Sequence, residues 1–100
     1  MTAKIHWKTQ EEGGRSKLPA GIGQPSYATV MRFADTADPW PPPVAWSLIV
    51  EKIAVQGSNF DWIANIRFLA DDAPSNELRV NRRFELYEGG KCVATGEILG

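Results

Sequence analysis

The sequence has a single cysteine, a single histidine and no long apolar run, and each scarcity excludes a class of structure. Because Cys92 stands alone, no disulfide can form within the chain and no cysteine-based metal cluster can be built. The opening residues, MTAKIHWKTQ, lack the apolar core of a signal peptide, and no segment approaches the length that crosses a bilayer. A cytoplasmic protein without a membrane segment is therefore expected.

Positive charge is also scarce, since 11 Lys and Arg against 12 Asp and Glu give a net charge of −1. No overall electrostatic field draws the chain to nucleic acid. The charge is unevenly distributed, because residues 1–32 carry +3, residues 33–77 carry −5 and residues 78–100 carry +1. A basic face could arise only if the fold brings the two ends of the chain together.

Motifs of catalysis and cofactor binding are missing as well. No Gly-x-x-x-x-Gly-Lys-Ser/Thr run occurs, so GTP binding is not expected. The lone His6 lacks a nearby catalytic partner in the sequence and is expected at an exposed or edge position. Asp71 and Asp72 lie in a Pro/Ser/Asn turn, where aspartate caps the backbone more often than it binds calcium. We expect neither an enzyme nor a cofactor or metal site.

The chain does contain the alternation of apolar and polar residues that is typical of half-buried β-strands. Its clearest strand is FDWIANIRFLA, whose inner face would carry Phe60, Trp62, Ala64, Ile66 and Phe68. Shorter strands are expected at 4–7 and 26–35, and another could begin at 78–80. Residues 9–25 and the proline-rich 36–43 read as loops.

In residues 44–55, VAWSLIVEKIAV, the apolar positions shift by one residue after Glu51, to Ile53 and Val55. A β-bulge near Glu51 would produce this shift. The number of apolar residues also fits a helix, but the flanking Pro and Gly and several β-branched residues favour a strand. Residues 57–59, GSN, are expected to form a turn.

The closing residues 84–100, FELYEGGKCVATGEILG, predict a β-hairpin with Gly89 and Gly90 as the central turn residues. A primed turn needs positive φ at both positions, which glycine adopts at little steric cost. In this register the facing pairs are Glu88 with Lys91, Leu86 with Val93 and Phe84 with Thr95. The chain thus predicts about six strands and no amphipathic helix, which indicates a small barrel or sandwich.

Two glycine turns, EEGGRS at 11–16 and YEGGKCVATGEILG at 87–100, resemble the C-terminal β-barrel domain of bacterial elongation factor Tu. That domain has an early acid–Gly–Gly–Arg loop and a last hairpin with Glu–Gly–Gly–basic. The matching residues are Glu12, Gly13, Gly14 and Arg15, then Phe84, Leu86, Glu88, Gly89, Gly90, Lys91, Val93 and Gly96. The resemblance implies one all-β domain over residues 1–100, a closed six-stranded antiparallel Greek-key barrel without the family's GTPase domain.

The resemblance also implies where the chain would bind. In the family, residues near both Gly-Gly loops touch the backbone of aminoacyl-tRNA, which implicates Arg15, Glu88 and Gly89 here. Lys17, Arg82, Arg83 and Lys91 could add phosphate contacts. The middle of the chain has no counterpart in the family, and Ser16 and Lys17 replace a histidine and a threonine. The alternative interpretation is that the glycines only form turns and the cations are solvated.

The preferred function is a non-catalytic bacterial module that binds another protein or a second copy of itself. Trp40, held between prolines, would contact the partner or cover an open end of the barrel. Binding of tRNA or ribosome-associated RNA through the two Gly-Gly loops is the alternative. The candidate binding residues are Gly13, Gly14, Arg15, Lys17, Trp40, Arg83, Glu88, Gly89, Gly90 and Lys91.

Overall fold

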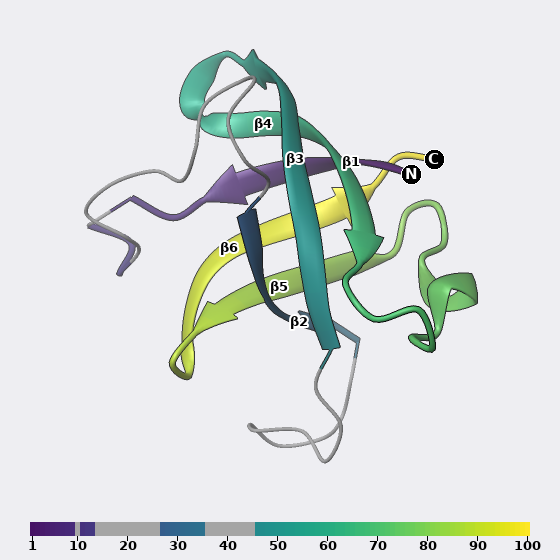
Figure 1. The fold of residues 1–100 in the computed structure, drawn as a ribbon. Helices are drawn as coiled ribbons and strands as arrows, with labels where there is room; N and C mark the ends of the chain where they lie inside the picture. Colours follow the sequence, from purple (N-terminus) through teal and green to yellow (C-terminus); the bar gives the residue numbers. More distant parts are fainter. Residues whose placement is uncertain (10, 14–26, 36–45) are drawn as a thin grey trace.

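The structure, a computed structural model, describes residues 1–9, 11–13, 27–35 and 46–100. The described residues form six strands, which close into one antiparallel barrel (Figure 1). The strands are β1 Thr2–Trp7, β2 Tyr27–Phe33, β3 Trp46–Gln56, β4 Ser58–Phe68, β5 Arg83–Glu88 and β6 Lys91–Ile98, and a short 3-10 helix, η1, spans Ser75–Glu77. No helix in these residues is long and apolar enough to cross a membrane.

The order of strands around the barrel is β1-β4-β3-β2-β5-β6, with β6 pairing back onto β1. Strands β2, β3 and β4 follow one another as neighbours, and β1 lies beside β4, which is the Greek-key arrangement. The predicted closed six-stranded Greek-key barrel is therefore confirmed. The expected loop at 9–25 lies mostly outside the described residues, and the proline segment at 36–43 lies wholly outside them.

The core follows from strand periodicity. On β4 the predicted inner face is confirmed, since Trp62, Ala64, Ile66 and Phe68 are buried and Phe60 packs against the core. β1 contributes Ala3, Ile5 and Trp7 by the same alternation. Because strands from both ends of the chain supply the core, the barrel cannot form from either half alone.

The expected bulge in β3 is present two residues after Glu51. Lys52 pairs with Ala64 and Ala54 pairs with Ile63, so Ile53 is the extra residue. The bulge does not return the apolar side chains to the core, because Ile53 and Val55 remain 43% and 46% exposed. The β3–β4 hairpin extends beyond the neighbouring strands at its turn (Figure 1), so its apolar residues reach past the packed interior.

The β5–β6 turn is of the predicted primed type. Gly89 and Gly90 have φ values of 56° and 84°, and Glu88 faces Lys91 as expected. The register beyond this pair differs from the prediction. A register shift occurs between Leu86 and Tyr87: Tyr87 faces Cys92, Leu86 faces Ala94, and Val93 is the extra residue.

This second bulge moves every later pair of the hairpin by one position. Leu86 faces Ala94 rather than Val93, and Phe84 faces Gly96 rather than Thr95. The physical reason is that Val93 and the residue after it are both buried, which a regular strand does not permit. The predicted pairs of Leu86 and Phe84 are therefore wrong by one residue.

No strand forms at 78–80 among the described residues, so that expectation is also wrong. Instead, Arg82 holds residues 75–82 in place through side-chain contacts. Its guanidinium donates to the Glu77 carboxylate at 2.5 Å and to the Asp35 carboxylate at 3.1 Å. The guanidinium also lies 3.6 Å from the centre of the Phe33 ring. These contacts join η1 to the end of β2 and leave Arg82 only 17% exposed.

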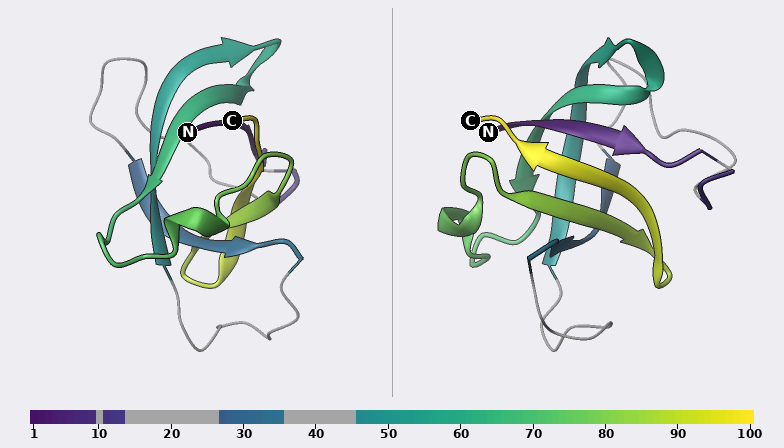
Figure 2. Two further views of the ribbon diagram at one scale, coloured as in Figure 1. Left: turned by 90° about the vertical axis from the view of Figure 1, so that its right-hand side faces the viewer. Right: turned by 180° about the vertical axis from the view of Figure 1, so that it is seen from behind.

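The alternating strand directions place three turns at one end of the barrel. These turns are Glu11–Gly13 after β1, Gly57 between β3 and β4, and Gly89–Gly90 between β5 and β6. We call this the glycine end, and it lies to the left in Figure 1. The opposite end holds η1 and the two termini. Residues 1 and 100 lie side by side in both views of Figure 2.

Candidate functional site

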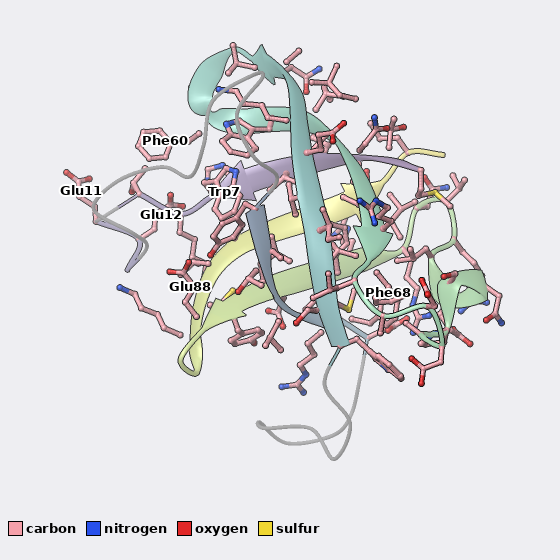
Figure 3. The ribbon with its side chains drawn as sticks, viewed as in Figure 1. Trp7, Glu11, Glu12, Phe60, Phe68 and Glu88 are labelled. Atoms are coloured by element: carbon pink, nitrogen blue, oxygen red, sulfur yellow. The ribbon has the colours of Figure 1, made fainter. Side chains whose placement is uncertain are left out.

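The glycine end presents bare backbone on a fixed scaffold. Gly13, Gly57 and Gly89 have φ values of 88°, 85° and 56°, and no described atom lies within 4 Å of where a Cβ would stand at each of them. Figure 3 shows Glu12, within the first of these turns, and Glu88, just before the last, on the same side of the molecule. Open glycine backbone allows another chain to approach its amides closely.

Aromatic residues support the turns from inside the barrel. Trp7 makes edge-to-face contacts with Trp62, at 5.0 Å between ring centres, and with Tyr27, at 5.4 Å. The Tyr27 hydroxyl donates to the Glu88 carboxylate, which ties β2 to the end of β5. Lys52 places its ammonium 4.9 Å from the centre of the Trp62 ring. The surface at the glycine end therefore rests on a packed aromatic layer.

The indole N–H of Trp7 is buried and finds no hydrogen-bond acceptor in the part of the chain that the structure describes. An unpaired buried donor normally destabilises a protein. Trp7 packs edge-to-face against Tyr27 and Trp62, so its ring lies among other aromatic side chains. Within the described residues, the aromatic layer therefore packs around a donor that has no hydrogen-bond partner.

Replacement of Trp7 by Phe should accordingly change the free energy of unfolding by less than about 1 kcal/mol, because the lost volume is offset by removal of an unpaired donor. In the wild-type protein the indole proton of Trp7 should resonate upfield of a hydrogen-bonded indole proton, because this N–H has no acceptor among the described residues. Urea unfolding and a proton–nitrogen spectrum measure the two quantities. A loss above about 2 kcal/mol together with an indole proton shifted downfield would mean that the N–H makes a strong hydrogen bond.

A cluster of polar side chains flanks the glycine end. His6 on β1 contacts Asp61 on β4 through Nδ1, at 2.9 Å, and Glu12 in the following turn through Nε2, at 3.1 Å. The Ser58 hydroxyl donates to the second Asp61 oxygen at 2.8 Å, and the Thr9 amide donates to Glu12 at 2.9 Å. We call His6, Glu12 and Asp61 the histidine cluster.

The cluster shifts the pKa of each of its members toward the charged form. The hydrogen bond with Asp61 is the main cause that raises the pKa of His6, and partial burial opposes it. The pKa of Asp61 is lowered by His6 first and then by Ser58. The pKa of Glu12 is lowered mainly by the hydrogen bond from the Thr9 amide, followed by His6.

The chemistry available to the histidine cluster is limited by its geometry. The two ring nitrogens face different carboxylates, so the three groups do not converge on one point, and no metal-binding group of three is found in the described residues. Nε2 faces the Glu12 carboxylate at the position where a catalytic histidine would face a nucleophile. The cluster therefore joins structural elements by charge and hydrogen bonds.

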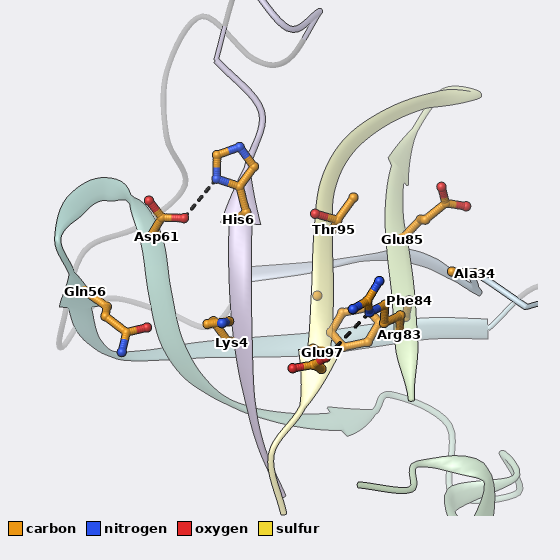
Figure 4. Close-up of a pocket in the computed structure, with 11 residues that line it drawn as sticks. Lys4, His6, Ala34, Gln56, Asp61, Arg83, Phe84, Glu85, Thr95 and Glu97 are labelled. Atoms are coloured by element: carbon orange, nitrogen blue, oxygen red, sulfur yellow. Dashed lines mark hydrogen bonds and ion pairs between the residues drawn. The ribbon is translucent and has the colours of Figure 1, made fainter. Parts of the chain in front are cut away.

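A groove of about 710 Å³ crosses the outer face of β1, β6 and β5 next to this cluster (Figure 4). Its side chains alternate in charge across neighbouring strands, as Lys4 faces Glu97 and Glu97 faces Arg83. The Arg83 guanidinium lies 3.5 Å from Glu97. Such cross-strand pairs stabilise the sheet. They leave the groove without a field of one sign that would select an anion or a cation.

The structure brings five of the predicted site residues together at the glycine end: Gly13, Glu88, Gly89, Gly90 and Lys91. Arg83 begins β5 and so lies at the opposite end of the barrel from Glu88. Arg82, considered as a phosphate contact, is occupied by Glu77 and Asp35. Gly14, Arg15, Lys17 and Trp40 lie outside the described residues.

The sequence did not reveal the histidine cluster, because His6 and Asp61 are 55 positions apart. The contact could have been found from the register of the strands. Once β1 is known to pair with β4, the outward-facing His6 lies opposite the outward-facing Asp61. Glu12 was visible only as part of a glycine turn. The alternation of apolar and polar residues within a strand does not tell which distant strand will pair with it.

The fold and the site together define a small Greek-key barrel with glycine turns and a supporting aromatic layer at one end. No protein-family model, curated protein or solved structure matches this chain.

Proposed function

We propose that this chain is a cytoplasmic, non-catalytic binding module related to the C-terminal barrel of elongation factor Tu, and that it binds another protein, or a second copy of itself, through the glycine end. One observation carries the proposal: the strand topology gathers three turns with open glycine backbone at one end of a closed barrel. The family kinship is supported by the two acid–Gly–Gly motifs, since the described part of the first, Glu12 and Gly13, and the whole of the second lie at this end.

The mixture of charge at the glycine end favours a protein over a nucleic acid. Among the described residues there, Glu11, Glu12 and Glu88 are acidic, whereas Lys8 and Lys91 are basic. A surface that binds phosphates through several contacts needs an excess of cations. Mixed charge around apolar support is compatible with a protein interface, in which polar groups surround a packed centre.

RNA remains the second candidate because of one local arrangement. The Lys8 amide donates to the Val93 carbonyl at 2.9 Å, so the backbone after β1 runs beside the start of β6, where Lys91 lies. Two lysines on adjacent segments next to open glycine amides could contact a phosphate backbone. Arg82 and Arg83, which would have extended such a basic face, lie at the other end of β5.

The binding end can be identified by site-specific photo-crosslinking. A photo-reactive residue at Lys91 should give adducts, either a dimer at high protein concentration or a complex in cells. The matched control is Arg79, an exposed cation near the opposite end, 66% exposed, from which we expect no adduct. Sedimentation velocity over a concentration series tests self-association separately.

Three outcomes would contradict this proposal. Adducts from position 79 but not from 91 would place the interface at the wrong end. A monomer that gives no adduct from either position would remove the protein-binding function. Retention of tRNA at low salt, weakened steeply by added salt and by Lys91→Glu, would favour the RNA candidate instead.

A further inference from the structure

The histidine cluster connects the barrel to one of the turns of the glycine end. Asp61 belongs to β4, directly opposite His6 on β1, and is held in addition by Ser58. Glu12 belongs to the turn and is bound to Thr9 in both directions, since its own amide donates to the Thr9 carbonyl at 3.0 Å and its carboxylate accepts from the Thr9 amide at 2.9 Å. His6 therefore ties the turn to β1 and β4, while the Lys8 amide ties the backbone just before the turn to β6.

The surroundings of His6 contribute further charges, but at greater range. On its own strand, Lys4 lies on the same outward face; on β6, Thr95 faces it and Glu97 is diagonal to it; Glu11 precedes Glu12 in the turn. Among the described residues, Asp61 and Glu12 are the groups that reach hydrogen-bond distance of the ring. The protonation state of His6 is thus felt mainly by these two carboxylates.

The two contacts respond differently to the loss of a proton. Imidazolium has two N–H groups and donates to both carboxylates, whereas neutral imidazole has one N–H and one lone pair. Asp61 should keep the remaining N–H, because its contact is the shorter, at 2.9 Å against 3.1 and 3.3 Å, and because strand pairing and Ser58 hold it in place. The lone pair on Nε2 then faces the Glu12 carboxylate, and the two repel.

We propose that the histidine cluster is a pH-dependent anchor for the Glu11–Gly13 turn: protonated His6 holds the turn against β1 through Glu12, and deprotonation releases it. The inference extends the proposed function, since this turn is part of the glycine end. It gives the module a recognition surface whose order depends on pH. A change of one proton on His6 would alter one of the three turns and leave the barrel itself intact.

The pH range of the anchor follows from the directions of the pKa shifts. The pKa of His6 is raised above its ordinary value of 6.5, so the stabilisation is complete below that value and is lost as the pH rises through the raised pKa. The pKa of Glu12 is lowered from 4.5. The stabilisation that the Glu12 carboxylate contributes is therefore complete above pH 4.5 and is lost as the pH falls through the lowered pKa. The anchor is therefore complete between about pH 4.5 and 6.5.

An NMR titration of the isolated protein tests the anchor without any partner. We expect the His6 ring and the backbone amide of Gly13 to titrate with the same midpoint, above 6.5, and the order parameters of residues 11–13 to fall above it. Glu12→Gln should lower the pKa of His6 and make these order parameters low at all pH values. Glu11→Gln, a neighbouring exposed acid in the same turn, is the matched control and should behave as the wild type.

Either of two results would overturn the inference: Gly13 titrating independently of His6, or Glu11→Gln reproducing the effect of Glu12→Gln. If Glu12→Gln perturbed the fold as a whole, core amide shifts would reveal it, and His6→Gln would then serve as the second variant, with the Gly13 titration expected to disappear. Failure of the crosslinking at Lys91 would refute the proposed function and leave these titrations unaffected, so the two failures are distinguishable.

Discussion

Replacing Gly96 by alanine is expected to lower the free energy of unfolding by about 3 kcal/mol, the upper part of the range for overpacked cores. A Cβ at this position would lie 2.3, 2.6 and 2.8 Å from three ring atoms of Phe84. The ring cannot move aside, because Phe84 is fully buried in the core. The φ of Gly96 is not positive, so the expected loss is steric and not conformational.

Gly57 is the matched control that separates steric overpacking from backbone strain. At Gly57 no described atom lies within 4 Å of a new Cβ, but φ is +85°, so Gly57→Ala should lose only about 1 kcal/mol through backbone strain. Phe84→Leu in the Gly96→Ala background should restore part of the loss, which a double-mutant cycle in urea measures. Equal losses at Gly96 and Gly57, or no coupling between positions 84 and 96, would contradict the packing of Phe84 over Gly96.

Trp62→Ala is expected to produce the other large loss, about 3–5 kcal/mol, from the cavity left by a buried aromatic residue. The substitution also removes the ring on which Trp7 packs and over which the Lys52 ammonium lies. Equilibrium urea unfolding gives the value. If Trp62→Ala does not fold, Trp62→Phe provides a smaller loss of the same origin.

The control for Trp62 is Ile53→Ala in the same hairpin. Ile53 is 43% exposed at the β3 bulge, so its truncation should change stability by no more than about 0.5 kcal/mol. A loss at Ile53 as large as that at Trp62 would mean that the bulged residue is covered by another part of the molecule. Comparison of Trp62→Ala with Ile53→Ala therefore tests which side chains of the β3–β4 hairpin belong to the core.

Much of the barrel could be predicted from the sequence, because two of its signals are local. The alternation from Phe60 to Phe68 depends only on the period of a strand, and the Gly89–Gly90 turn depends only on positive φ. Both were confirmed. Closure of the barrel required β1 to pair with β6, and the resemblance between the two glycine motifs and a known barrel was what suggested it.

The errors share a physical cause, namely that they depend on neighbours distant in the sequence. The Val93 bulge cannot be recognised locally, since VAT reads as a regular strand whether or not Val93 is extra. Val55 alternates as a core residue should, but its hairpin extends past the packed interior. The contact of His6 with Glu12 and Asp61 exists only because of how β1 pairs and where its turn folds.

The adjacency of residues 1 and 100 has a practical consequence. The Thr2 amide donates to the Gly100 carbonyl at 2.8 Å, at the end of the barrel opposite the glycine turns. Any tag, tether or fused domain, attached at either terminus, should emerge away from the proposed contact surface and leave it accessible. A short peptide joining the two termini would also permit circular permutants that are cut open elsewhere, without stretching the pairing of β1 with β6.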